Sequence, residues 1–163
     1  MRVREQFVSA LAIGAIVVAV AVGAILYMQR GAHIDLPGGM TKVRTVSTGE
    51  NDALALIDLK IANPSSYKFV VHNVTVVLEK KTGEQFPQEI VSRSDAERLF
   101  DALPDSGPYY PPLYTNVTLQ PGATGVYTLV AQFNAPEKIL QDRKRFLVQI
   151  DEIDGKSFEF SEK

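Results

Sequence analysis

The chain has 163 residues, of which 22% are charged, with a formal net charge of −2 and no cysteine. The absence of cysteine excludes disulfides, thiolate metal sites and cysteine nucleophiles. Nucleic-acid binding requires clustered positive charge, so a mildly acidic mixture of both signs argues against a nucleic-acid partner. The length allows one domain and an appendage.

An uncharged apolar stretch runs from Phe7 to Met28. As a helix it would span about 33 Å at about 1.5 Å per residue, which matches a hydrocarbon core of about 30 Å. The sequence therefore predicts a tail over residues 1–6, a single transmembrane helix over residues 7–28, and membrane lipid as the partner of that helix.

A cleaved signal peptide is the alternative for the same stretch. Its apolar region would normally have about 7–15 residues and end at a small-residue cleavage site. This stretch is longer and ends in Tyr27-Met28-Gln29-Arg30, so we expect it to be retained as an anchor.

Two short features of the predicted helix concern orientation and packing. Arg2 and Arg4 precede it, and the positive-inside rule then favours a C-terminal domain outside the cytoplasm, which is the periplasm in a bacterium. Ala15, Ala19 and Gly23 form a stripe of small residues at every fourth position. The stripe indicates either a surface for packing against another helix or simply the frequency of small residues in this segment.

Residues 29–42 contain three glycines and a proline without apolar periodicity, which predicts a linker before a domain over residues 43–163. The first clear strand is Ala53–Ala62, where alternate residues from Ala55 to Ile61 are apolar and Asp58 lies on the opposite, polar face. A second run, Lys68–Lys80, places Val70, Val74, Val76 and Leu78 on one face. The turn residues between the two runs favour a β-hairpin.

The remaining elements complete an all-β pattern. A capping box at Ser94–Glu97 predicts a short helix to about Leu103, and a loop over residues 104–114 with four prolines follows it. With a first strand at Val43–Ser47, the further strands lie at Thr115–Leu119, Val126–Phe133, Phe146–Ile150 and around Phe158 and Phe160. We predict an antiparallel, immunoglobulin-like β-sandwich of about seven strands with one short inserted helix, preceded by a single transmembrane helix.

The run IDLKIANPSSYKFVVHNVTVVLE, from Ile57 to Glu79, resembles the type-2 late embryogenesis abundant proteins with their water-stress (WHy) domain. Asn63, Pro64 and Tyr67 match the Asn-Pro pair and the following aromatic of that family, and the turn Leu119–Gly122 is also similar. The resemblance implies an immunoglobulin-like fold without an enzyme active site, associated with desiccation tolerance or with membranes.

The sequence offers little that could carry catalysis. The two histidines, His33 and His72, have no second histidine at a metal-ligand spacing. Asp151 and Glu152 would point to opposite faces of a strand, and Asp154 belongs to a predicted turn. We therefore expect no catalytic residues, no metal, no cofactor and no enzyme activity.

The loop over residues 104–114, called the Pro/Tyr loop below, is the most unusual segment. Tyrosine offers a large contact area at low entropic cost, and proline fixes a loop before it binds. Tyr109, Tyr110 and Tyr114 are therefore candidate partner-binding residues, and the alternative is that their rings cap the core.

Two functional hypotheses follow. The first is a membrane-tethered, non-catalytic binding or scaffolding domain with a protein partner at the membrane, for example as an accessory subunit of a membrane protein complex. The second is a stress-protective or lipid-handling module of the late embryogenesis abundant type.

Overall fold

The computed structural model describes residues 18–20, 22–24 and 36–162, and it divides the chain into two compact units, Met1–Ile34 and Asp35–Lys163. Ala19 and Gly23 lie in helical, exposed stretches. Ala15 and most of the predicted transmembrane segment, residues 7–28, lie outside the described residues, as do residues 29–35 of the predicted linker. Within the described ranges, no helix is both long enough and apolar enough to cross a membrane.

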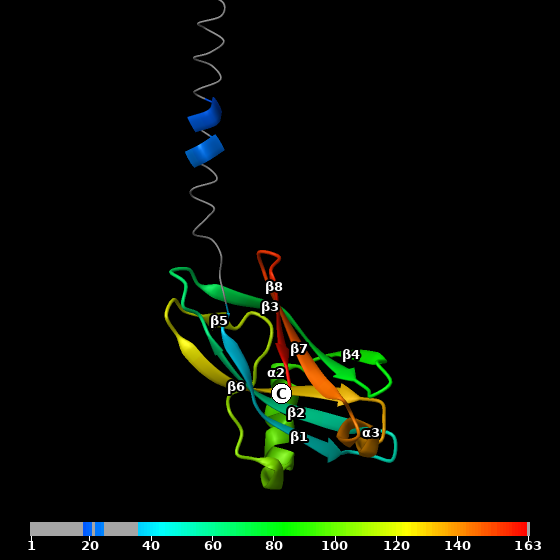
Figure 1. The fold of residues 1–163 in the computed structure, drawn as a ribbon. Helices are drawn as coiled ribbons and strands as arrows, with labels where there is room; N and C mark the ends of the chain where they lie inside the picture. The colour runs from blue at the N-terminus through cyan, green and yellow to red at the C-terminus, as the bar shows by residue number, and fades with distance from the viewer. Residues whose placement is uncertain (1–17, 21, 25–35, 163) are drawn as a thin grey trace, which may run out of the picture. The chain divides into compact units, whose positions relative to one another are not determined.

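The second unit is a β-sandwich (Figure 1). One sheet has the strand order β1-β2-β6, the other has the order β4-β3-β7-β8, and β5 pairs with β3. The predicted antiparallel sandwich is confirmed. Over residues 36–162 the strands are β1 Gly38–Ser47, β2 Ala53–Ala62, β3 Phe69–Glu79, β4 Gln85–Glu89, β5 Thr118–Leu119, β6 Thr124–Phe133, β7 Arg145–Glu152 and β8 Ser157–Ser161; the helices are α2 Arg93–Ala102, η1 Pro104–Ser106 and α3 Glu137–Gln141.

The core lies between the two sheets. Ile57 and Leu59 of β2 are fully buried, as is Val76 of β3, and Phe133 of β6 packs against Phe146 of β7 with ring centroids 5.9 Å apart. Burying such side chains contributes roughly 1.5–3 kcal/mol each. The apolar face predicted for β2, from Ala55 to Ile61, is therefore confirmed. The strand is not half-buried as predicted, because Leu54, Leu56 and Asp58 on its other face are buried as well.

The alternation predicted for β3 fails at its beginning. The pairing with β7 shifts between Val71 and Asn73, where a bulge inserts one residue. The bulge moves the preceding residues to the other face, so Phe69 and Val71 are buried whereas Val70 is only half-buried. Sequence periodicity cannot register such an insertion.

The predicted hairpin of β2 and β3 is wrong, because these strands lie in opposite sheets. The buried Asn63 directs the crossing between them. Its Nδ2 donates to the carbonyl oxygens of Tyr67, at 2.8 Å, and of Leu119, at 3.0 Å, while its Oδ1 accepts from the Ser65 amide. These bonds fix the connection, and β2 pairs with β1 and β6 instead.

The linker was expected to reach residue 42, whereas β1 already begins at Gly38. Gly38 pairs with Ile61, and a Cβ on Gly38 would collide with the carbonyl oxygen of Lys60. Glycine in a strand often marks such a close backbone approach. Two of the three glycines that suggested a linker, Gly38 and Gly39, are therefore part of the sheet.

A third layer covers the outer face of the β1-β2-β6 sheet. Helix α2 and the residues after it pack Leu99, Phe100, Leu103 and Tyr109 against Leu54, Leu56 and Val130. The N-cap of α2 is Ser92, whose Oγ accepts a hydrogen bond from the Asp95 amide. The prediction had placed the N-cap at Ser94. Neither α3 nor the short strand β4 was predicted from the sequence.

Candidate functional site

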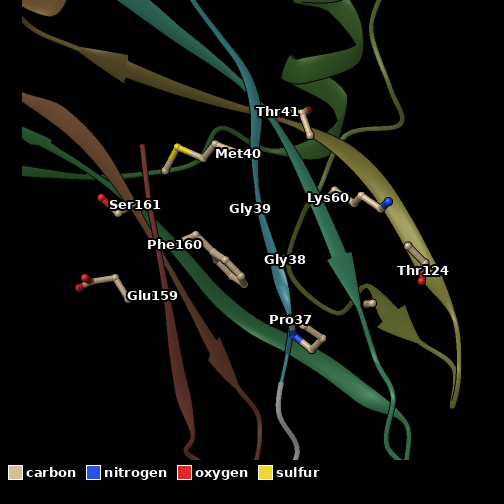
Figure 2. Close-up of a pocket in the computed structure, with 11 residues that line it drawn as sticks. Pro37, Gly38, Gly39, Met40, Thr41, Lys60, Thr124, Glu159, Phe160 and Ser161 are labelled. Carbon is tan, nitrogen blue, oxygen red and sulfur yellow. The ribbon is translucent and has the colours of Figure 1, made fainter. Parts of the chain in front are cut away.

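A groove of about 620 Å³ lies between β1 and β8 (Figure 2). Figure 2 shows the side chains of Met40 and Phe160 extending from these two strands into the space between them. Gly38 and Gly39 form part of its wall, and neither contributes a side chain. Its rim carries charges of both signs, Lys60 and Glu159.

Two unpaired strand edges face this groove. In the described part of the chain, β1 has β2 as its only strand neighbour, and β8 has only β7. A strand edge presents a row of backbone N–H and C=O groups that can pair with another extended chain. A β-edge beside a groove for alternate side chains is one of the recurring arrangements for peptide recognition.

The Pro/Tyr loop lies on the three-stranded sheet at a buried ion pair. The Asp58 carboxylate is 2% exposed and accepts from Arg44 Nη2 and, at 2.7 Å, from Thr128 Oγ1. Arg44 Nη1 donates to the carbonyl oxygens of Ser106 and Pro108, the latter at 3.0 Å. The prediction that Asp58 faces solvent is wrong, because the loop covers it.

The three candidate tyrosines have different surroundings. Tyr109 is half-buried, stacks on Phe100 with ring centroids 4.3 Å apart and donates from its hydroxyl to the Leu103 carbonyl. Tyr114 is also half-buried, and Arg93 Nη1 donates to its hydroxyl at 3.2 Å. Tyr110 is 46% exposed, although Thr128 Oγ1 holds its amide at 3.0 Å. Tyr109 thus belongs to the layer over the sheet, and Tyr110 projects from it.

The acidic residues near the β7–β8 turn do not form a joint site. Hydrogen bonds from Ser157 and Gln149 lower the pKa of the Asp151 carboxyl, whereas burial raises the pKa of the Glu152 carboxyl. Among the residues that the structure describes, no group of three or more histidine, aspartate or glutamate side chains could hold a metal ion.

Sequence reasoning missed both the groove and the ion pair. The groove arises where β1 and β8, more than a hundred residues apart in the chain, come to face each other. Asp58 did carry a signal, since it shares a strand face with Leu54 and Leu56. That face also carries Lys60, but the two leucines before Asp58 indicate that this part of the face is covered, and a buried acid is normally paired.

Neither a protein-family model nor a curated protein matches the chain. Among solved structures, it is similar to the archaellum periplasmic stator complex of FlaF and FlaG from Sulfolobus acidocaldarius, with 17% identity over 77% of this chain and 87% of that one and a TM-score of 0.38. It is also similar to an uncharacterized β-sandwich protein from Clostridium difficile 630, with 11% identity over 78% and 85% and a TM-score of 0.42. A third is the putative ApaA protein from Bordetella pertussis, with 14% identity over 80% and 89% and a TM-score of 0.39. At such TM-scores the similarities support no conclusion about this chain.

Proposed function

We propose that this chain is a membrane-tethered, non-catalytic binding domain that holds an extended segment of a protein partner in the groove between β1 and β8. It would act as an accessory subunit of a membrane protein complex. The proposal rests mainly on one observation: two unpaired strand edges face a single groove, and apolar side chains, Met40 and Phe160, line it. Backbone pairing would supply affinity, and Met40 and Phe160 would select apolar side chains of the segment.

The strand order supports an immunoglobulin-like assignment for this domain. The sheet β1-β2-β6 opposite β3-β7-β8 has the arrangement of strands A-B-E opposite C-F-G in immunoglobulin sandwiches. Such sandwiches commonly serve as binding modules. Fold alone does not establish a function, so the proposal rests on the groove.

The tether and its orientation rest on the sequence. The apolar residues 7–28 would anchor the domain, and Arg2 and Arg4 favour placing it outside the cytoplasm. An anchor raises the local concentration of the domain at the membrane, so that a partner segment can be held at modest intrinsic affinity.

The test starts from full-length protein purified in mild detergent with its co-purifying partner. In the complex, backbone amides of residues 38–42 and 157–161 should exchange more slowly with deuterium than in the protein alone. Gly39→Arg should remove the partner, because Gly39 lines the groove and a long charged side chain there, which meets nothing within 4 Å of its Cβ, would stand at the β1 edge where the segment has to pair. Ser47→Arg, at the exposed far end of the same strand, is the matched control and should retain it.

Two results would contradict the proposal. One is a Gly39→Arg protein that keeps its partner. The other is slower exchange at the Pro/Tyr loop in place of β1 and β8. Lipid as the only bound species would favour the late embryogenesis abundant type of module.

A further inference from the structure

Three turns lie together at the end of the sandwich where the chain enters the domain. The Ala62 amide donates to the Pro37 carbonyl at 2.9 Å, which places the start of β1 beside the β2–β3 connection. The Gly122 amide donates to the Asn63 carbonyl, and the Ile153 amide donates to the Val70 carbonyl. We call this surface the entry end; it consists of residues 63–68, 120–123 and 153–156 (Figure 1).

The entry end exposes two large apolar side chains. Tyr67 is 60% exposed and Ile153 is 58% exposed. The backbone of Tyr67 is held in place, since its carbonyl accepts from Asn63 Nδ2 and, at 2.9 Å, from Ser65 Oγ. A tyrosine ring with an apolar body and a polar hydroxyl suits an interface that buries one end and leaves the other hydrated.

Charge distinguishes the entry end from the opposite end, which consists of residues 48–52, 80–84 and 134–144. The entry end has three charged residues, Lys68, Asp154 and Lys156. The opposite end has ten: Glu50, Asp52, Lys80, Lys81, Glu84, Glu137, Lys138, Asp142, Arg143 and Lys144. Three charges among 14 residues compare with ten among 21, so the entry end is the less densely charged of the two and would bring fewer charged groups to the lipid surface.

We propose that the entry end rests on the lipid surface, with the Tyr67 ring and the Ile153 side chain in the interfacial layer. This inference rests on the membrane tether of the proposed function. Seven residues, 29–35, separate the predicted membrane segment from Leu36. Even fully extended they span at most roughly 25 Å at about 3.3–3.6 Å per residue. A tether that joins the domain at its entry end limits the distance of that end from the bilayer, and tyrosine is enriched at membrane interfaces.

The experiment uses the full-length chain in phosphatidylcholine vesicles. Because the chain lacks cysteine, Ser66→Cys places a single environment-sensitive fluorophore beside Tyr67 without altering it. Lys81→Cys places the same fluorophore at the opposite end as the matched control. Lipids that carry a headgroup spin label should quench the label at residue 66 and leave the label at residue 81 unquenched.

A double variant links the quenching to the two apolar side chains. Tyr67→Ser with Ile153→Ser, in the Ser66→Cys background, should abolish the quenching at residue 66. Its melting temperature should stay near that of the parent, because both side chains are exposed. Quenching that persists unchanged in this variant would contradict the inference.

Vesicle flotation separates the two proposals. A chain that does not float with vesicles would refute the tether and, with it, the lipid contact. A chain that floats while residue 66 is as unquenched as residue 81 would refute the lipid contact alone. Shielding of residue 66 only when a co-purified protein is present would assign the entry end to that protein and also refute the inference.

Discussion

On one lateral side of the sandwich, β1 and β8 face each other across a groove, whereas the other side is closed by added chain. There Pro112 and Ile90 form isolated bridges to Thr128 and Ala131 along the outer edge of β6. The Thr128 amide also donates to the Pro111 carbonyl at 3.0 Å. The adjacent edge strand β4 contains Pro87, which has no amide to offer to a further strand.

The two sides differ in how their strand edges are covered. Uncovered edges invite pairing with other chains, and proteins usually block them. The closed side uses proline and the Pro/Tyr loop for this purpose, with Arg44 and Asp58 holding the loop in place. This domain blocks the edges of β6 and β4 but leaves those of β1 and β8 available. The contrast suggests that the available edges bind another chain.

The largest expected effect comes from breaking the anchor of the closed side. Asp58→Ala would leave Arg44 buried without its carboxylate, and losing one partner of a buried ion pair costs about 3–5 kcal/mol. Lys60→Ala, at an exposed position on the same strand, is the control and should change stability by no more than about 0.5 kcal/mol. Urea denaturation measures both, and equal effects would show that the ion pair does not hold the loop.

Next in size is the aromatic contact beneath the same loop. Tyr109→Ala removes a half-buried ring that stacks on Phe100, and we expect a loss of about 3 kcal/mol. Tyr109→Phe keeps the stack and loses one hydrogen bond, which is worth about 1 kcal/mol. Thermal melting of both variants separates the ring from its hydroxyl. A negligible loss for Tyr109→Ala would contradict the assignment of this ring to the layer over the sheet.

On the open side, neighbouring glycines should respond differently to the same substitution. Gly38→Ala forces a Cβ against the Lys60 carbonyl and should cost about 1–3 kcal/mol. Gly39→Ala meets nothing within 4 Å and should be neutral or slightly stabilising, since alanine lowers the entropy of the unfolded chain. Chemical denaturation of the pair measures the difference, and equal stabilities would argue against the close approach of β1 to β2.

A smaller, pH-dependent effect is expected where β8 ends. Burial acts to raise the pKa of the Glu162 carboxyl, but hydrogen bonds from Arg143 and the Phe146 amide outweigh it and lower the pKa overall. The ionised carboxylate therefore stabilises the fold above the ordinary glutamate pKa of about 4.3, and this stabilisation is lost as the pH falls through the lowered value. Glu162→Gln should lose about 1 kcal/mol at neutral pH and show a shallower acid decline. Melting temperatures between neutral and acidic pH measure this, and parallel curves for the two proteins would contradict it.

The smallest stability effect is expected at the exposed tip of the Pro/Tyr loop. Tyr110→Ala should change stability by no more than about 0.5 kcal/mol, because the ring is 46% exposed. We expect this variant to retain the partner that Gly39→Arg loses. A stable Tyr110→Ala protein without its partner would move the binding surface from the groove to the loop.

Local patterns predicted much of the sandwich. The strand patterns identified β2 and β6, and the turn predicted at Asp154 joins β7 to β8, where Gly155 has a φ of 88°. The capping pattern located α2 to within two residues. These features depend on neighbours in the chain, which is why they can be inferred without the tertiary structure.

Local sequence patterns did not predict β4 and α3, because contacts with distant residues stabilise these two elements. The strand β4 contains a proline and lacks apolar alternation. It forms because its backbone pairs with residues 75–79 of β3. Helix α3 has five residues and no side-chain cap, so its sequence carries little helical signal. Its buried Leu140 and the bond from Thr45 Oγ1 to Glu137 Oε1, at 2.8 Å, dock it instead.

Composition and periodicity are local properties, and they were enough to predict a long apolar segment followed by a strand-rich domain without cysteine. Three further features appear only in the folded chain: β2 and β3 separate into two sheets, Asp58 is buried, and Gly38 belongs to a strand. The physical reason is common to all three: strand pairing, burial of a charge and close backbone approach each depend on residues far away in the chain. The groove between β1 and β8 is the clearest case, since its two walls belong to different sheets and come together only in the folded sandwich.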